Sequence, residues 1–385
     1  MDSNTEPIPI WAGAKLYGKV GDLGVGLLNV TTAASGEQAT QNHTVARVRH
    51  VFDGGNTVGV LTTSSNDLGG QSSANRHTVG LDSSMSLVEN RLELSTFIDL
   101  SIDEDAADSL GSASQIGIDY RGRIWQPELF VTRVDDAYRP ALGFVRRRNI
   151  VDIEAESQWT FRPPEGLLSQ IQIETYHKTI TDDSLSDYLG RESGLETSFR
   201  SRTGWSLVSR LSHEEDIIDD EFELPTGELV SAGTYTGLSA FVRLRTPWIR
   251  NPNVSITYDW TNGFYGGEKH GVKLGSGLNV GPHFRFTTSI YGTTFQLPGY
   301  ERSKTLTVNC GLTTAFSSTL FWENNLQAIS VDESGRILSR IRWRYLPGSD
   351  LFIVYQEDVE RRDRQLESKD RRFVFKLTYW WDAVL

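Results

Sequence analysis

Apolar and polar residues alternate along most of this chain, and a period of two dominates the pattern. Side chains two residues apart share one face of a β-strand, whereas on a helix they would scatter around the circumference. The alternation is clearest in segments 336–346, 151–161 and 372–381, and no amphipathic helix of any length is evident. About 20 such segments of about ten residues each predict a large antiparallel sheet.

The connections between these segments differ in length. Short turns rich in Gly, Pro, Asn and Asp occur at 53–56 (DGGN), 121–123 (RGR), 280–283 (VGPH) and 347–350 (PGSD). Longer polar connections are predicted at 101–111, 181–187, 213–233 and 358–370. Short turns on one rim and long loops on the other are typical of outer-membrane barrels.

The pattern favours a membrane barrel over a soluble β-sandwich or propeller, which also have many short strands. Aromatic residues stand at the ends of the apolar face, the opposite face is charged along its middle, and no repeat of fixed period is visible. We therefore predict an all-β chain forming a large antiparallel transmembrane β-barrel of about 20–22 strands, with short turns on the periplasmic rim and long loops on the extracellular rim. The expected lipid-interface aromatics are Trp343, Tyr345, Tyr379, Trp381, Trp159 and Phe161.

Composition is compatible with this reading. Hydrophobic residues make up 38% of the 385 residues, and no apolar stretch approaches the roughly 20 residues of a spanning helix. A barrel strand needs only about 9–11 residues, of which every second one is apolar. The net charge of −12 argues against nucleic acid as a partner. The Met1 end has no signal-peptide pattern, so we expect a mature chain numbered from an added Met, or a fragment.

If the apolar face meets lipid, the charged face lines a lumen. The predicted lumen-lining charges are Arg340, Arg342, Arg344, Asp152, Glu154, Glu156, Arg47, Arg49, Arg243, Arg245 and Lys376. Alternate residues of a strand stand roughly 7 Å apart, so the first three arginines form a ladder that repels itself unless carboxylates face it. Two interpretations remain open: ion pairs that brace a large barrel, and a transverse field that selects a polar solute.

An acidic stretch invites a calcium hypothesis, because Ca²⁺ prefers several oxygen ligands. The weak candidate ligands are Glu214, Glu215, Asp216, Asp219 and Asp220, with Glu221 and Glu223 beside them. Their spacing matches no EF-hand, and a solvated acidic loop is the alternative.

Sequence motifs typical of enzymes are scarce, since the seven His are dispersed without an HExxH motif and no GxSxG turn is present. Cys310, the single cysteine, is interpreted as a small packing residue.

Several stretches resemble a family of bacterial outer-membrane proteins whose function is uncharacterised. They are 9–19 (PIWAGAKLYGK), 26–30 (GLLNV), 143–148 (GFVRRR), 263–268 (GFYGGE), 320–322 (LFW), 342–355 (RWRYLPGSDLFIVY) and 377–381 (LTYWW). In that family a periplasmic domain similar to a family-nine carbohydrate-binding module precedes a C-terminal barrel. The resemblance implies that residues 1–385 are a single barrel domain, without the sugar-binding-like domain and without one initial strand before Pro7. It implies no catalytic residues.

The favoured hypothesis is a channel, or an import or export pore, in the bacterial outer membrane that conducts a polar solute. Around 20 strands would leave a water-filled lumen unless loops fold into it. The alternatives are a plugged structural or docking barrel whose extracellular loops bind a partner, and an outer-membrane enzyme. We expect no cofactor. The expected partners are outer-membrane lipid, a polar or saccharide-like solute, and a periplasmic domain or partner chain.

Overall fold

The alternating segments form β-strands throughout the part of the chain that the structure describes. The computed structural model describes all residues except 1–7, 35–38, 70–74, 105, 363–364 and 381–385. Twenty-one strands are assigned to one sheet, and strands consecutive along the chain pair in antiparallel register. The described residues contain no α-helix and only one short 3₁₀ helix, η1 (Asp53–Gly55). The predicted all-β fold class with about 20–22 antiparallel strands is therefore confirmed.

The chain divides into two compact units, and the boundary passes through β9, β10 and β11. Unit 1 comprises Met1–Trp159 and Glu174–Ser193, and unit 2 comprises Thr160–Ile173 and Gly194–Leu385. The first strands are β1 (Ile10–Val20), β2 (Leu23–Thr32), β3 (Gln41–Val51), β4 (Thr57–Asp67), β5 (Arg76–Leu87), β6 (Leu92–Asp103), β7 (Leu110–Tyr120), β8 (Trp125–Val134) and β9 (Ile150–Phe161). They are followed by β10 (Leu168–Thr181) and β11 (Tyr188–Ser201).

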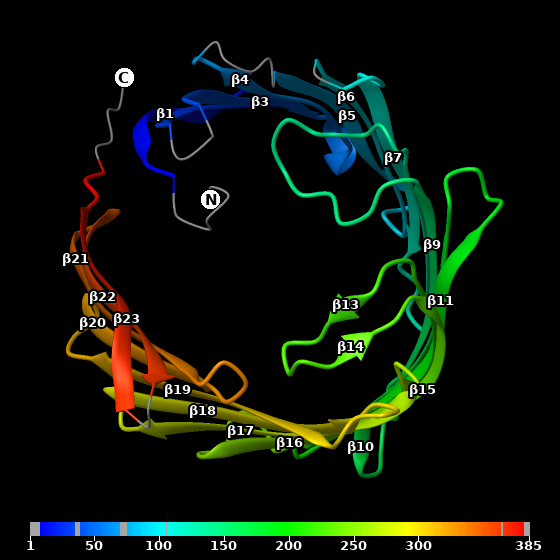
Figure 1. Cartoon of the computed structure of the whole chain (residues 1–385), viewed down its shortest axis with the longest axis vertical. Coiled ribbons are helices and arrows are strands. Elements are labelled where there is room, and N and C mark those ends of the chain that lie inside the picture. Colours follow the sequence, from blue (N-terminus) through cyan, green and yellow to red (C-terminus); the bar gives the residue numbers. More distant parts are fainter. Residues whose placement is uncertain (1–7, 35–38, 70–74, 105, 363–364, 381–385) are drawn as a thin grey trace. The chain divides into compact units, whose positions relative to one another are not determined.

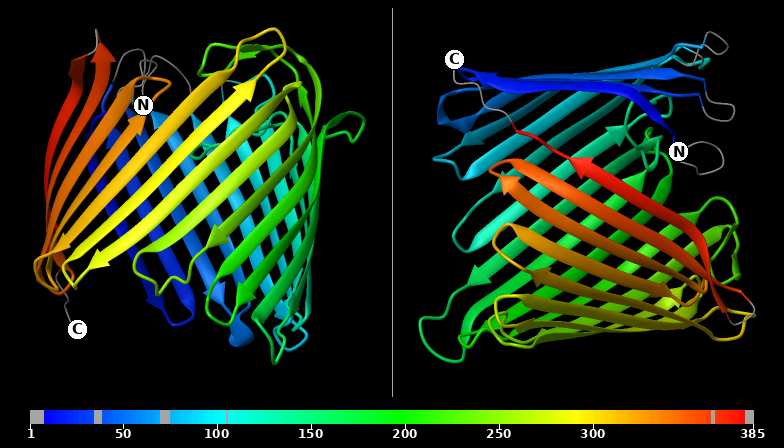
Figure 2. Two further views of the ribbon diagram at one scale, coloured as in Figure 1. Left: turned by 90° about the horizontal axis from the view of Figure 1, so that it is seen from below. Right: turned by 90° about the vertical axis from the view of Figure 1, so that its left-hand side faces the viewer.

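Unit 2 continues the same up-and-down order, with one small hairpin inserted. Its strands are β12 (Ser206–Ile218), β13 (Phe222–Glu223), β14 (Leu229–Val230), β15 (Gly233–Arg245), β16 (Asn253–Phe264), β17 (Gly267–Val280), β18 (Phe284–Gln296), β19 (Ser303–Ala315), β20 (Leu320–Ile329), β21 (Ser334–Leu346), β22 (Ser349–Arg362) and β23 (Gln365–Leu377). The hairpin β13–β14 forms a separate two-stranded sheet. Figure 1 shows a curved sheet in each unit, and Figure 2 shows its strands side by side and tilted.

The predicted short turns are confirmed where Gly and Pro set them. Residues 53–56, 121–123, 280–283 and 347–350 all lie at or between the ends of successive strands. Gly54, Gly281 and Gly348 have positive φ angles of 84°, 60° and 75°, which glycine adopts without the strain of a Cβ atom.

Two of the predicted long connections need correction. The described residues of the interval 358–370 belong to strands and not to a loop, because β22 extends to Arg362 and β23 begins at Gln365. Charged side chains pair there across the strands, as in Arg336–Asp358 (2.6 Å), and along them, as in Arg372–Asp370 (2.6 Å), so the sheet continues through a run of charges. The interval 213–233 is also shorter than predicted, since β12 runs to Ile218. The connections 101–111 and 181–187 are confirmed, because β6 ends at Asp103 and β7 begins at Leu110, and residues 182–187 separate β10 from β11.

The longest connection in unit 1 was not predicted at all. It runs from the end of β8 at Val134 to the start of β9 at Ile150.

None of the described helices is long and apolar enough to cross a membrane.

Candidate functional site

Each unit exposes a continuous row of apolar side chains on one face of its sheet, called here the apolar face. In unit 1 the directly paired residues Val25, Val48, Val60, Leu81 and Ile98 follow one another across five strands. Their exposed fractions lie between 37% and 56%. Scattered exposed apolar residues are normal on a soluble protein, but a contiguous apolar band marks a surface that meets another apolar phase.

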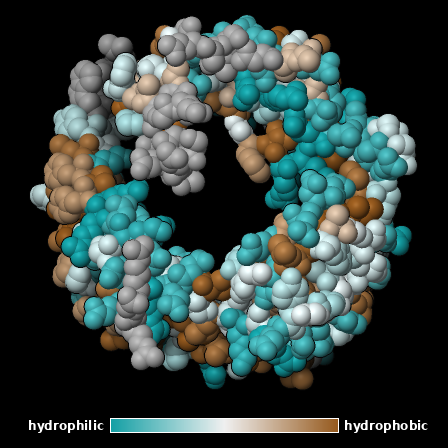
Figure 3. All heavy atoms as spheres, viewed as in Figure 1, coloured by the Kyte–Doolittle hydropathy of each residue, from teal (hydrophilic) through white to brown (hydrophobic). Residues whose placement is uncertain are grey.

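Unit 2 has an equivalent row. Leu244, Ile256, Leu274 and Ile290 are paired across β15 to β18, and all four are exposed. The alternate residues of the same strands point to the concave side of the sheet, called here the polar face. Figure 3 shows hydrophilic residues along much of this side.

All eleven charged residues predicted to line a lumen lie on the polar face. Arg47 and Asp82 form one of its ion pairs, with 2.8 Å between Nη2 and Oδ1. The two residues sit on β3 and β5, so their side chains meet above Gly59 of the intervening strand β4. A Cβ atom at Gly59 would lie 2.7 Å from Asp82 Oδ2, which shows why this position has no side chain.

The predicted arginine ladder on β21 is neutralised by neighbouring strands. Arg340 pairs with Glu323 of β20. Arg342 donates two hydrogen bonds of 3.1 Å each to the carboxylate of Asp350, and Arg344 Nε lies 3.5 Å from the same carboxylate. The expectation that carboxylates face this ladder is therefore met in the structure: Glu323 faces Arg340, and Asp350 is shared by Arg342 and Arg344.

The acidic ladder of β9 is only partly compensated. Lys178 of β10 contacts both Asp152, at 2.8 Å, and Glu154. Glu156 is instead directly paired with Glu128 of β8. Within the described residues neither Glu128 nor Glu156 has an ion-pair partner, so this part of the unit 1 wall carries net negative charge.

Four of the predicted basic residues have no carboxylate partner in the part of the chain that the structure describes. The Arg243 guanidinium lies 5.3 Å from the ring centroid of Phe241, a cation–π distance. Arg49, Arg245 and Lys376 lie on the polar face without an ion pair. They leave positive charge available at their positions along this face.

A loop that sequence reasoning missed covers part of the polar face in unit 1. Residues 135–148 fold onto the concave side of β5 and β6, as the teal loop before β9 in Figure 1 shows. The backbone N–H of Arg139 donates to Ser101 Oγ (2.8 Å), and that of Ala141 donates to Thr78 Oγ1 (2.9 Å). The hydroxyl of Tyr138 donates to Asp99 (3.3 Å), and burial beside this carboxylate raises the pKa of Tyr138.

A second segment lies on the polar face of unit 2. The hairpin β13–β14 packs through Val230 on Phe295 and Leu297, which are all buried. The buried carboxylate of Glu228 accepts a hydrogen bond from Thr226 within the hairpin and one from Ser303, which ties the hairpin to β19. Burial opposes ionisation of Glu228, but these hydrogen bonds lower its pKa overall. The only sequence signal for this hairpin was the polar turn at residues 225–227 within an otherwise acidic stretch.

The candidate calcium ligands are divided by the structure. Glu214, Glu215 and Asp216 belong to β12, where neighbours point to opposite faces, and Asp219 and Asp220 follow the strand end. Among the residues that the structure describes, no group of three His, Cys, Asp or Glu side chains is arranged to hold a metal ion. The described residues therefore provide no set of ligands that would support the calcium hypothesis.

The predicted interface aromatics cluster at strand ends. Trp343 and Tyr345 lie together on β21, with 5.9 Å between ring centroids, and Trp159 is paired with Trp125. Phe161 ends β9 and is exposed. Tyr379 lies beyond the end of β23, so the strand is shorter than its alternation suggested, and Trp381 lies outside the described residues.

Comparison with known proteins assigns no family to this chain. No family model matches it, and no curated protein matches it. A similar solved structure is the ferric-catecholate import receptor Fiu from E. coli K12 in its open form, with a TM-score of 0.44 and 7% sequence identity. The match covers 90% of this chain and 67% of the receptor chain. At this score the likeness carries no conclusion about function.

Proposed function

We propose that this chain is a transmembrane β-barrel of a bacterial outer membrane that conducts a polar solute along its polar face. The observation that carries the proposal is the pair of exposed apolar rows, in which every member is directly paired to the next across the sheet. Such a band would be costly in water and suits the hydrocarbon layer of a bilayer. Aromatic residues near the strand ends, such as Trp343 and Trp125, suit its interfaces.

The polar face supports the conducting role. Many of its charges are paired, yet Arg49, Arg245, Glu128 and Glu156 keep charge that is not neutralised by described neighbours. Charged walls of this kind select among solutes by sign.

A second candidate function is a plugged barrel that docks a partner. The specific observation in its favour is that residues 135–148 and the hairpin β13–β14 both cover parts of the polar face. A plugged barrel would fold and insert into a membrane but would pass no current.

Reconstitution of the folded chain in planar bilayers separates the two functions. We expect discrete single-channel currents, and Arg342→Glu should shift selectivity towards cations because it removes positive charge and places a carboxylate beside Asp350. The control is Arg371→Glu, which changes the charge equally on the opposite face, at the Glu357 pair. Silent but folded protein would favour the docking function, and equal selectivity of both variants would remove Arg342 from the conducting wall.

A further inference from the structure

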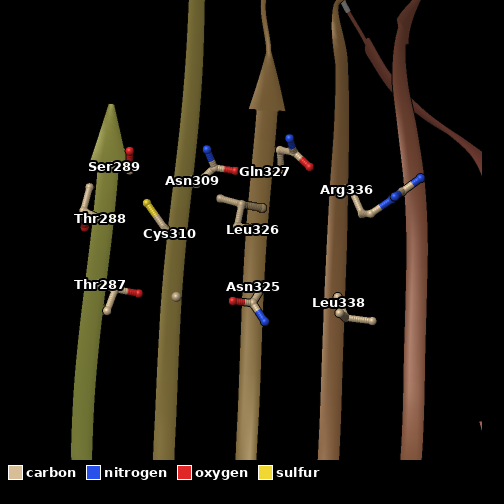
Figure 4. A pocket seen from close by; sticks show the side chains of 11 residues that line it. Thr287, Thr288, Ser289, Asn309, Cys310, Asn325, Leu326, Gln327, Arg336 and Leu338 are labelled. Carbon is tan, nitrogen blue, oxygen red and sulfur yellow. The ribbon is translucent and has the colours of Figure 1, made fainter. Parts of the chain in front are cut away.

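The polar face of unit 2 contains a groove that is lined mostly by uncharged polar side chains. It lies across β18 to β21, has a volume of about 300 Å³, and is shown in Figure 4. Its polar lining consists of Thr287, Ser289, Asn309, Asn325, Gln327 and Arg336. We call it the amide groove.

The strand register places these side chains in two adjacent rows. Ser289, Asn309, Gln327 and Arg336 are directly paired in that order across four strands. Thr287, Gly311 and Asn325 form the second row, two residues further along each strand. Four strands at a spacing of about 4.8 Å span about 14 Å, and the rows stand roughly 7 Å apart.

Gly311 opens the floor of the amide groove between Thr287 and Asn325. A Cβ atom at this position would lie 2.5 Å from Thr287 Oγ1 and 3.3 Å from Asn325 Oδ1. Any larger residue would fill the space between the two rows. The groove therefore depends on the absence of a side chain at its centre.

The amides of the groove have hydrogen-bonding capacity that the described residues do not use. Elsewhere on the polar face such groups bond to one another, as Gln115 does to Thr132 at 2.8 Å. Asn309, Asn325 and Gln327 have no side-chain partner within the described part of the chain. Each amide offers both donors and acceptors, which matches hydroxyl groups that also donate and accept.

The groove is close to electrically neutral. Its only charged lining residue, Arg336, is held by both oxygens of Asp358, at 2.6 and 3.2 Å. Leu338 contributes an apolar edge next to the amides. A solute that fits this surface has many hydroxyl groups, no net charge and some C–H surface.

We propose that the amide groove binds an uncharged polyhydroxy compound, such as a sugar of one or two rings. This inference rests on the proposed function in that it names the chemical class of the polar solute. The groove would hold that solute against the wall through amide–hydroxyl hydrogen bonds, with the ring C–H groups over Leu338.

Equilibrium binding to the folded full chain tests the proposal without requiring a channel. The protein is held in micelles of a detergent that carries no sugar, and methyl glucoside, glucosamine and glucuronate are titrated by calorimetry and ligand-observed NMR. We expect the neutral methyl glucoside to bind more tightly than either charged ring. Equal or absent binding of all three would overturn the proposal.

Variants locate the binding on the groove. Asn309→Ala and Asn325→Ala should each weaken methyl glucoside binding about three- to tenfold, the effect of one lost hydrogen bond. The matched control is Gln115→Ala, an amide on the polar face of unit 1, which should leave binding unchanged. Asn325→Asp should reverse the preference in favour of glucosamine, because a carboxylate then faces its ammonium group.

The outcomes separate this inference from the proposed function. Sugar binding that responds to Asn309→Ala, together with silent bilayers, would keep the groove and reject conduction. Currents in bilayers without sugar binding would keep conduction and reject the groove. Loss of binding in the Gln115→Ala control to the same extent as in Asn309→Ala would also reject it.

Discussion

At the scale of single residues, the polar face shows how charge is accommodated on a densely paired sheet. The alternation of residues in the sequence was sufficient to place Arg47 on a charged face, but it did not identify Asp82 as the partner. That pairing depends on the register of β4 between them and on the missing side chain of Gly59. A pattern with period two reports the face of a residue and carries no information about register between strands.

Gly59→Val should therefore destabilise the protein. Its branched side chain would push Arg47 and Asp82 apart and crowd β4, at a cost of about 1–3 kcal/mol. Unfolding by urea in micelles measures the change. Gly26→Val is the control, because a Cβ atom at Gly26 of β2 has nothing within 4 Å, and its effect should stay within about 0.5 kcal/mol. Equal stability of the two variants would show that the ion pair moves aside without cost.

At the scale of elements, strands were predictable and connections less so. The turns with Gly and Pro were located correctly because Gly adopts the positive φ angles that such turns need and Pro fixes φ locally. The charge-rich interval 358–370 was predicted as a loop because polarity was taken to exclude a strand, yet its charged residues pair within the sheet, as Asp358 does with Arg336 and Asp370 with Arg372. The loop 135–148 was missed because its anchors, Thr78 and Ser101, are distant in sequence.

Removing the two hydroxyl groups that hold the loop 135–148 tests whether they keep it on the polar face. The double variant Thr78→Val, Ser101→Ala removes two acceptors of backbone N–H groups, worth about 2 kcal/mol together, and should increase the open population of the loop about thirtyfold. Trypsin cleavage after Arg146, Arg147 or Arg148 measures the opening. Ser83→Ala, which removes a hydroxyl pair with Thr96 away from the loop, should leave the cleavage rate unchanged. Similar cleavage rates in the double variant and in the unmodified protein would mean that other contacts hold the loop, such as the hydrogen bonds of Tyr138 to Asp99 and of Ser112 to Asp135.

At the scale of the whole molecule, the two faces of the sheet have opposite preferences for solvent. The ion pairs and the amide groove favour contact with water or a polar solute, whereas the paired rows of exposed Val, Leu and Ile favour contact with an apolar phase. A soluble sandwich would bury the second face against another sheet. The described residues leave both rows exposed, so the environment of the apolar face decides between a membrane protein and a soluble one.

The environment of the apolar face can be determined by placing an arginine at two positions along one strand and measuring how much each substitution lowers the free energy of unfolding. Ile98 lies at the middle of β6 and Ile102 near its end, both exposed on the apolar face and separated by roughly 13 Å. In a bilayer, Ile98→Arg should destabilise folding by about 2–4 kcal/mol and Ile102→Arg by about 0–1 kcal/mol, because the penalty falls from the midplane to the interface. Urea titration of the chain folded into lipid vesicles gives both values. Small and equal costs at the two positions would place the apolar face in water and overturn the membrane assignment, whatever currents the protein carries.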